Sequence, residues 1–449
     1  MDTATKIGIV GGGVEGVALA QYLKRKGFSS VQIFDEKNVA PDVPAGIEMV
    51  LGPDAFTKMY ECQVLFRSPG IHTNRLDSAR KKGITVTSTT QYFFENCPCR
   101  IVGVTGTKGK GTTATLIHLM LKEAGFDAYL GGNIGESPLN FIDALSKDSI
   151  VVLELSSFQL QDLKMSPHVA VVVMTTSEHM DYHKDVAEYR EAKSSIVRFQ
   201  KPEDFAVLNK DYAYTEEFAK LTPAKKLFVS TKESSGDGSH IMGPKIVNCI
   251  GVKCEMIGDT AKVALPGKHN LENVVAAVAA ARALDVPIPA VQKIVYTFAG
   301  LPHRLELIRE KDGVKYYNDS FSTTPETSVA ASYAFNGPVI LIAGGSEKKS
   351  DYTEWGMELQ KNKNLKLVIL MGVTADRMEQ NLRSAAEKLK AEFPLKVHRA
   401  GNLDGALKVA GENAASGDYV VLSPAAASFD MFKNYKERGE KFRSLVNGL

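Results

Sequence analysis

The stretch IVGVTGTKGKGTTAT, residues 101–115, decides how the rest of the chain is interpreted. It predicts a strand over 101–104, a glycine-rich turn over 106–111 and a helix that opens at Thr112. In such a turn, several backbone N–H groups point into one concavity at a helix N-terminus, where the helix dipole also favours anions. Lys110 adds a positive charge for the outer phosphates, and a nearby hydroxyl can hold Mg²⁺. The stretch therefore predicts an ATP site.

The turn departs from the usual Walker pattern in two places. Val104 stands where the first glycine would be, and Gly111 follows Lys110, which displaces the hydroxyl to Thr112. A glycine-rich turn with a purely structural role is the alternative. The ATP-binding residues predicted from this loop are Gly106, Thr107, Lys108, Gly109, Lys110, Gly111, Thr112 and Thr113.

Length and composition limit the class of protein. A chain of 449 residues is too long for one core and predicts two to four domains. The formal net charge of +2 implies no general attraction to nucleic acid or membranes. No apolar run is long enough to span a membrane, and the N-terminus leads directly into a predicted strand without a signal peptide. We therefore expect a cytoplasmic monomer with no nucleic-acid partner and no membrane insertion.

The cysteines are few and odd in number. The segment Cys97-Pro98-Cys99 has the spacing of neither a metal site nor a redox motif. We therefore expect free thiols in a reducing cytoplasm at all five positions, which are Cys62, Cys97, Cys99, Cys249 and Cys254.

Short apolar strands alternate with amphipathic helices along the chain, the pattern of parallel α/β sheets. A Gly- and Pro-punctuated linker over 299–303 and a hairpin signal at 311–313 separate the last block from the rest. The predicted fold class is α/β with three domains, over residues 1–95, 96–299 and 300–449.

A second nucleotide signal lies at the N-terminus. The segment GGGVEG, residues 11–16, follows a strand and opens a helix, and Asp35 closes the next strand. This is the dinucleotide fingerprint, in which glycines let the backbone approach a diphosphate and the acid can bind ribose hydroxyls. Taken alone, the segment favours an oxidoreductase that uses NAD or FAD, and glycines cannot distinguish NAD from UDP. A purely structural role for Asp35 and Ser68 is the other alternative.

Three residues of the middle block are candidates for chemistry. Glu154 ends the apolar run 150–153 and projects from the carboxyl end of a strand, where α/β sheets place ligands, although it could also cap the next helix. His179 follows a strand in a polar turn, and a lone loop histidine is usually only solvated. Lys193 lies on a predicted helix over 186–199, where most lysines are at the surface.

These segments together resemble the Mur ligase superfamily. The loop TGTKGK has its ATP-loop pattern, and glycine after the lysine also occurs in the folylpolyglutamate synthase branch. Seven further segments, in the order of the family, resemble most closely the branch that adds D-glutamate to UDP-N-acetylmuramoyl-L-alanine: 131–135, 153–160, 179–181, 189–193, 267–270, 301–304 and 422–425.

The resemblance implies an ATP-dependent ligase of peptidoglycan synthesis. A Rossmann-like first domain would bind the UDP-linked substrate, a P-loop-like middle domain ATP, and a Rossmann-like third domain the amino acid. ATP would phosphorylate the substrate carboxylate, and the amine of glutamate would attack the acyl phosphate. Two Mg²⁺ ions would be held by Thr112, Glu154, His179 and a carbamylated Lys193, and the catalytic residues would be Lys110, Glu154, His179 and Lys193.

The resemblance also assigns binding residues. ATP contacts beyond the loop would be Asn270 and Asn273 near the adenine, Arg304 on the linker and Asp319. The UDP-linked substrate would be bound by Gly13, Val14, Glu15, Asp35, Ser68, Pro69, Gly70, Asn133, Ser156, Ser157 and Gln159. Glutamate would be bound by Thr323, Lys348, Ser428, Phe429 and Tyr435.

The main departure from the family is Phe321, where a lysine is usual. The segment 321–326 also resembles a minor branch that adds L-glutamate, so both enantiomers stay open, with D-glutamate favoured by the rest of the resemblance. A folylpolyglutamate synthase lacks the first domain. An NAD-dependent oxidoreductase rests on residues 11–16 alone, and a non-catalytic scaffold is disfavoured because Lys110, Glu154, His179 and Lys193 are present together.

Overall fold

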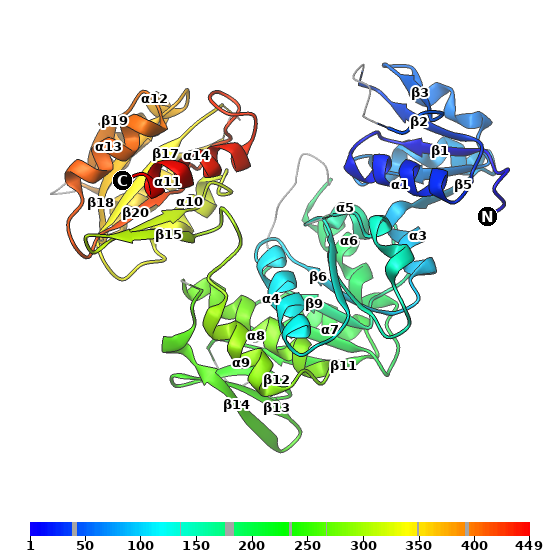
Figure 1. Cartoon of the computed structure of the whole chain (residues 1–449), viewed down its shortest axis with the longest axis horizontal. Coiled ribbons are helices and arrows are strands. Elements are labelled where there is room, and N and C mark those ends of the chain that lie inside the picture. Colours follow the sequence, from blue (N-terminus) through cyan, green and yellow to red (C-terminus); the bar gives the residue numbers. More distant parts are fainter. Residues whose placement is uncertain are drawn as a thin grey trace. The chain divides into compact units, whose positions relative to one another are not determined.

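The computed structural model describes residues 1–37, 43–134, 136–175, 184–232, 236–265, 267–347, 350–390 and 395–449. The chain forms two compact units, one of Met1–Lys262 with Leu271–Tyr296 and the other of Val263–Asn270 with Thr297–Leu449 (Figure 1). The first unit holds three sheets and the second holds one.

The first sheet has five parallel strands in the order β3-β2-β1-β4-β5. Its central strand IGIV is buried at every position, as expected for a parallel strand covered on both faces. The strands are β1 Ile7–Val10, β2 Val31–Asp35, β3 Glu48–Leu51, β4 Val64–Arg67 and β5 Thr85–Ser88, and the helices are α1 Val14–Arg25, α2 Asp77–Lys81 and α3 Thr89–Asn96.

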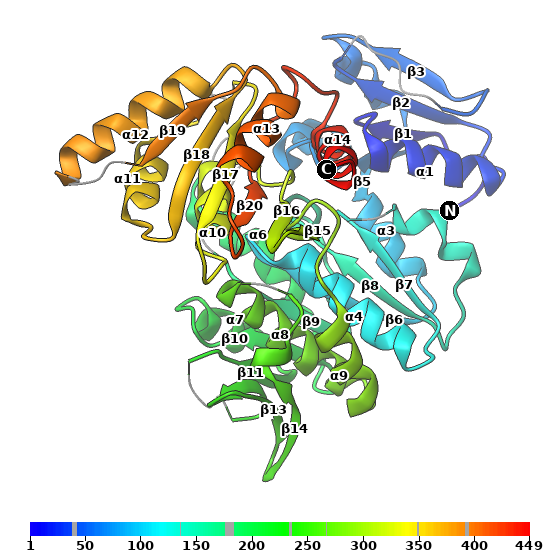
Figure 2. The same ribbon diagram turned by 60° about the vertical axis from the view of Figure 1, so that its left-hand side comes forward.

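The second sheet has six parallel strands in the order β11-β10-β9-β6-β8-β7. The pairing of β6 with both β8 and β9 brings the carboxyl ends of these strands to one edge, and Figure 2 shows β6, β8 and β7 side by side. The strands are β6 Arg100–Thr105, β7 Ala128–Gly132, β8 Ile150–Glu154, β9 Val169–Val172, β10 Phe205–Asn209 and β11 Lys225–Val229. The helices are α4 Lys110–Glu123, α5 Ser157–Leu160, α6 Val186–Arg198, α7 Thr215–Leu221, α8 Lys268–Ala283 and α9 Ile288–Thr297.

A small antiparallel sheet follows, which the sequence pattern did not suggest. It consists of β12 Gly238–Met242, β13 Lys245–Ile250 and β14 Lys253–Asp259. Cys249 and Cys254 face each other across the β13–β14 pair, with Cα atoms 4.0 Å apart, and form a disulfide. The expectation of five free thiols is therefore wrong for these two, because the hairpin brings residues five positions apart into register.

The sheet of the second unit has the order β15-β16-β20-β17-β18-β19, with β15 antiparallel and the others parallel. Alternate residues of β17 enter two cores, Leu341 on one face of the sheet and Ile340 on the other. The strands are β15 Glu306–Lys311, β16 Val314–Asn318, β17 Val339–Gly344, β18 Leu365–Met371, β19 Lys396–Arg399 and β20 Tyr419–Leu422. The helices are α10 Pro325–Ser332, α11 Thr353–Lys361, α12 Ala375–Leu389, α13 Leu403–Asn413 and α14 Tyr435–Asn447.

The α/β class is confirmed, and so is the hairpin at 311–313, where Asp312 (φ 53°) and Gly313 (φ 76°) connect β15 and β16. The boundaries of the three domains stay a prediction. In the described part of the chain, no helix has the length and apolar character needed to cross a bilayer.

Candidate functional site

The glycine-rich loop between β6 and α4 is closely packed against its surroundings. Gly106 has φ 154°, and a Cβ there would lie 2.6 Å from a methyl group of Val173. Gly109 is the N-cap of α4 with φ 86°, and a Cβ there would collide with the side-chain oxygen of Asn273 on α8. Side chains at these two positions would therefore be strained, so the loop conformation requires glycine there.

Helix α4 begins at Lys110, two residues earlier than predicted. The Nζ of Lys110 donates to the carbonyl of Thr107 at 2.9 Å, so its amine lies over the loop. The backbone N–H of Thr107 donates to the carbonyl of Met174, and its hydroxyl lies 2.9 Å from the hydroxyl of Tyr189. Asn273 accepts from the hydroxyl of Thr113 at 3.4 Å, which places one predicted adenine-side residue next to the loop.

Glu154 is the last residue of β8 and is buried, 4% exposed. Asn133 donates to its Oε1 at 2.9 Å, so two predicted ligands from β8 and the loop after β7 meet. Ser156 caps α5 instead, since its hydroxyl accepts from the N–H of Gln159 and the Gln159 side chain accepts from the N–H of Ser156. The alternative that Glu154 caps this helix is therefore wrong.

Lys193 is not at the surface, as a helical lysine usually is, but is 1% exposed. Its Nζ donates to the carbonyl of Gly106 at 2.9 Å and to the hydroxyl of Thr105 at 3.2 Å, and lies 4.7 Å from the centre of the Tyr189 ring. Helix α6 thus presents this amine to the start of the phosphate loop.

The loop hydroxyls, Glu154 and Lys193 all lie on elements that meet at the carboxyl edge of the second sheet. Val104 and Glu154 are paired positions of β6 and β8. Among the residues that the structure describes, no three His, Cys, Asp or Glu side chains form a metal-binding cluster. His179 lies outside the described residues.

The glycines of residues 11–16 form the turn between β1 and α1. Gly11 has φ 101°, and a Cβ on Gly16 would collide with the carbonyl of Gly11. Asp35 accepts from the N–H of Gly12 at 2.7 Å, and Ser68 donates its hydroxyl to the carbonyl of Gly11 at 2.6 Å. Both side chains therefore support this turn, and their contact with a ligand stays a prediction.

Glu15 joins this turn to the second sheet's loops. Gln159 donates to its Oε1 at 2.6 Å. Loss of water around the carboxyl raises the pKa of Glu15 to about 7, although the Gln159 hydrogen bond and the charge of Arg67 act in the opposite direction. Glu15 and Gln159, both predicted to bind the UDP-linked substrate, are thus brought together.

Asp319 follows β16 in the second unit and is buried. Burial raises its pKa to about 6, while hydrogen bonds from the Ser423 hydroxyl, 2.7 Å, and the Leu305 N–H, 3.1 Å, favour the ionised form. The guanidinium of Arg304 lies 3.6 Å from the centre of the Phe321 ring. Phe321, which stands where the family usually has a lysine, therefore stacks on Arg304, a predicted ATP contact.

Among the predicted glutamate residues that the structure describes, Tyr435 contacts this aromatic side chain. The Tyr435 ring meets Phe321 edge-on at 5.0 Å. Ser428 is buried and Phe429 is 70% exposed. Lys348 lies outside the described residues, and Thr323 lies two residues after Phe321.

Two buried arginines were missed by the sequence analysis. Arg438 on α14 donates to the carbonyls of Ala426 and Ala427 and to both oxygens of Ser320, and burial lowers its pKa to about 10. It thereby fixes the loops after β16 and β20. Arg67, at the end of β4, does the same in the first unit, and the only available sequence signal was a charged residue at the end of an apolar strand.

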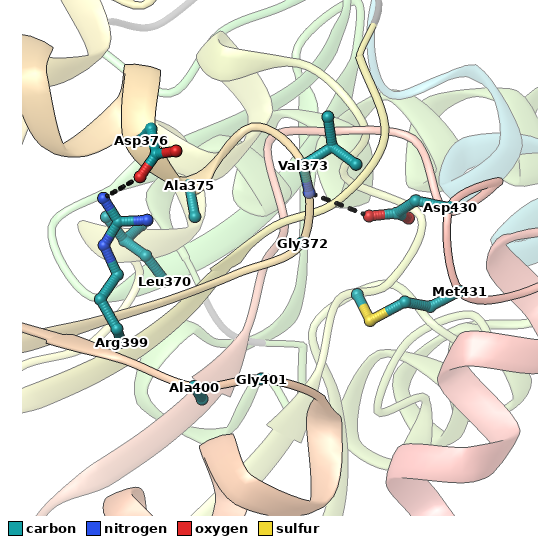
Figure 3. Close-up of a pocket in the computed structure, with 10 residues that line it drawn as sticks. All are labelled: Leu370, Gly372, Val373, Ala375, Asp376, Arg399, Ala400, Gly401, Asp430 and Met431. Carbon is teal, nitrogen blue, oxygen red and sulfur yellow. Dashed lines mark hydrogen bonds and ion pairs between the residues drawn. The ribbon is translucent and has the colours of Figure 1, made fainter.

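A cavity of about 690 Å³ lies at the carboxyl ends of β18 and β19 (Figure 3). Asp430 accepts from the N–H of Val373 at 3.2 Å, and Arg399 pairs with Asp376 at 2.8 Å on its wall. Although Asp430 follows Ser428 and Phe429 in sequence, none of the predicted glutamate residues that the structure describes, Thr323, Ser428, Phe429 and Tyr435, lines the cavity.

Comparisons with known proteins agree with this architecture. The Mur ligase middle domain matches residues 104–281, and the Mur ligase glutamate ligase domain matches residues 303–426. The UDP-N-acetylmuramoylalanine–D-glutamate ligase of Acetivibrio thermocellus is 38% identical over 99% of this chain and 96% of its own. The ligase of the same name from Symbiobacterium thermophilum is 36% identical over 98% of this chain and 97% of its own.

A solved structure shows the same fold at low identity. The MurF ligase of Thermotoga maritima, solved in complex with ADP, covers 99% of this chain and 96% of its own at 18% identity, with a TM-score of 0.58. The fold and the sequence relatives thus lead to one assignment. The chain belongs to the Mur ligase family, among the UDP-N-acetylmuramoylalanine–D-glutamate ligases.

Proposed function

We propose that this protein is an ATP-dependent ligase that joins glutamate, preferentially D-glutamate, to UDP-N-acetylmuramoyl-L-alanine in peptidoglycan precursor synthesis. The observation that carries the proposal is the meeting of Lys110, Lys193 and Glu154 at the phosphate loop. This arrangement suits a reaction in which ATP converts the substrate carboxylate into an acyl phosphate and the amine of glutamate then displaces phosphate.

In this proposal the loop 106–113 binds the phosphates of ATP through its backbone N–H groups. Lys110 leaves the carbonyl of Thr107 and neutralises the outer phosphates, since phosphoryl transfer depends mainly on positioning and on preorganised positive charge. Asn273 lies beside the loop. The family resemblance implies further ATP contacts from Asn270, Arg304 and Asp319.

The donor set at the carboxyl edge of the sheet suits Mg²⁺, which prefers oxygen ligands and takes only one or two carboxylates besides phosphates and waters. Buried Glu154 and the hydroxyl of Thr112 would supply two such oxygen ligands, and the imidazole of His179 would add a nitrogen ligand. Two Mg²⁺ ions, when bound, would neutralise the charge of the phosphates. A carbamylated Lys193 would add a further carboxylate, and its position against Gly106 supports this role.

The family resemblance implies which residues would bind the other two substrates. The UDP-linked substrate would contact the turn 13–15 and the loop 68–70, together with Asp35, Asn133, Ser156, Ser157 and Gln159. Glutamate would be bound by Thr323, Lys348, Ser428, Phe429 and Tyr435. We also propose that the protein is a cytoplasmic monomer.

Release of phosphate from ATP tests the proposal. Turnover should require UDP-N-acetylmuramoyl-L-alanine together with glutamate. L-glutamate remains the alternative co-substrate because of Phe321. An NADH fluorescence titration tests the oxidoreductase alternative, which predicts saturable binding of NADH at the turn 11–16.

A further inference from the structure

Arg67 carries a charge into the interior of the first unit, since its side chain is 0% exposed. Its Nε and one terminal nitrogen donate to the two carboxylate oxygens of Asp162, each at 2.7 Å. The terminal nitrogen that pairs with Asp162 also donates to the carbonyl of Phe158 at 2.7 Å, and the other terminal nitrogen donates to the carbonyl of Ile71 at 2.8 Å. A buried charge with bidentate pairing and satisfied donors is geometrically fixed, and loss of one partner is costly.

The acceptors of Arg67 belong to two different loops. Ile71 lies in the loop after β4 of the first sheet, as does Pro69, whose carbonyl accepts from Arg67 at 3.2 Å. Phe158 and Asp162 lie in and after α5, which follows β8 of the second sheet. One guanidinium thus joins the loop that carries Ser68, Pro69 and Gly70 to the segment that carries Ser156, Ser157 and Gln159.

A second contact runs along the same junction. His72, just after the first loop, lies 3.0 Å from the carboxylate of Glu188 on α6, and Gln161 donates to that carboxylate at 3.0 Å. These groups are partly exposed, whereas Arg67 is not. Arg67 is therefore the fully buried charged group of this junction, which the hydrogen bond from Gln159 to Glu15 and a shared apolar core also hold together.

We propose that Arg67 is a positioning residue for the UDP-linked substrate, because it sets the separation of the two segments that hold this substrate. This inference rests on the proposed function. Arg67 itself needs no contact with the substrate. Weakening the hydrogen bonds of Arg67 should make both of these segments less fixed and should leave the ATP loop in place.

The test compares Arg67→Lys and Asp162→Asn with Arg75→Lys as a matched control. Arg75 also forms a two-nitrogen pair, with Glu36, but the pair is exposed and lies within one domain. We expect both test variants to raise the KM for UDP-N-acetylmuramoyl-L-alanine about 10-fold or more, with the KM for ATP changed less than about 2-fold. Arg75→Lys should change neither value.

Each result decides something different. An unchanged KM for the UDP-linked substrate in a folded Asp162→Asn variant would overturn the role of Arg67 alone. An equal rise in the KM for ATP would show a general structural effect and overturn it too. Absence of turnover in the unmodified protein would remove the proposed function, and the inference with it. If Arg67→Lys does not fold, Asp162→Asn, which keeps the shape of the side chain, decides.

A separate observation concerns the segment between α3 and β6. Cys97 and Cys99 are partly exposed free thiols with sulfur atoms 3.5 Å apart. The hydrogen bond from Cys99 lowers the pKa of Cys97, and the same contact raises that of Cys99. The spacing had excluded a redox motif, but the backbone between the two residues brings the sulfurs into contact.

We infer that Cys97 and Cys99 form a reversible disulfide when the protein meets a peroxide. The Cys97 thiol loses its proton, and the thiolate attacks one peroxide oxygen to give a sulfenic acid and hydroxide, which takes up that proton and becomes water. The Cys99 thiol then attacks the sulfenic sulfur, which forms the S–S bond and releases a second water. Two thiols and one hydrogen peroxide thus become one disulfide and two waters.

Peptide mapping after brief treatment with equimolar hydrogen peroxide and alkylation tests this inference. We expect the peptide with Cys97 and Cys99 to lose two hydrogens and to regain them with dithiothreitol. Cys62 is the internal control, because it is buried and burial raises its thiol pKa to about 11. In Cys99→Ser the reaction should stop at a sulfenic acid on Cys97, which dimedone labels. Alkylation of both Cys97 and Cys99 in the treated protein would overturn the inference.

Discussion

Replacement of Lys193 separates its structural role from its chemical role. Lys193→Met keeps most of the side-chain volume, replaces Cδ by sulfur and removes the nitrogen that donates to Gly106 and Thr105. A buried acceptor left without its donor costs about 1–3 kcal/mol, which a domain stable by about 5–15 kcal/mol tolerates. Lys193→Ala also leaves a cavity, and comparable truncations cost about 2–5 kcal/mol. The Met variant should therefore stay folded at 25 °C.

The chemical role predicts a much larger effect on turnover. If the proposed carbamate is a required anion, both variants should lose about 10²–10³ in kcat, the effect of one lost preorganised group. Lys193→Arg should be equally inactive because Arg cannot form a carbamate. Phosphate release is the assay, and thermal unfolding verifies that each variant is folded.

Added formate provides a sharper comparison of the same variants. It should partly restore Lys193→Ala, whose cavity can admit a small carboxylate, and should not restore Lys193→Met, whose side chain fills the space. More than a tenth of the original kcat in folded Lys193→Met or Lys193→Arg would refute the carbamate reasoning.

Three further predictions concern Lys110, Glu15 and the choice of amino acid. Lys110→Ala should lower kcat about 10²–10³-fold in the phosphate-release assay, and retention of more than a tenth of kcat would contradict its role. Burial raises the pKa of Glu15 to about 7 from its ordinary value of 4.5. Its stabilising contribution is therefore complete below about pH 4.5 and is lost as pH rises through 7. Over this window, the unfolding free energy measured with urea should therefore fall less steeply with pH in Glu15→Gln than in the unmodified protein. The two slopes should differ by up to about 1.4 kcal/mol per pH unit, and equal slopes would contradict the raised pKa of Glu15. Glutamate should be used and aspartate rejected, because the shorter side chain cannot reach Lys348 and the hydroxyls of Thr323 and Ser428 together; equal kcat/KM for the two would exclude this arrangement.

Local sequence signals predicted the elements whose shape depends on neighbouring residues. The strand, turn and helix around Lys110 were recognised because glycines and a following amphipathic run specify that geometry locally. Glu154 was placed correctly at the end of β8 for the same reason. These features include most of the proposed ATP site.

Features that depend on distant packing were not predictable in this way. Lys193 has the sequence context of a surface lysine, and only the packing of α6 against β6 buries it. Arg67 pairs with Asp162, which lies 95 residues further along the chain, and no periodic pattern in the sequence predicts that pairing. The disulfide of Cys249 and Cys254 depends on the register of a hairpin in a sheet that the sequence pattern did not suggest.

Phosphate release from ATP with defined substrates tests the central claim most directly. The purified protein should release phosphate with UDP-N-acetylmuramoyl-L-alanine and D-glutamate, and omission of either substrate should abolish the release. Turnover with L-glutamate alone would overturn the preferred enantiomer. Absence of turnover with both enantiomers, under conditions where the protein is folded and Mg²⁺ is present, would contradict the proposed ligase activity.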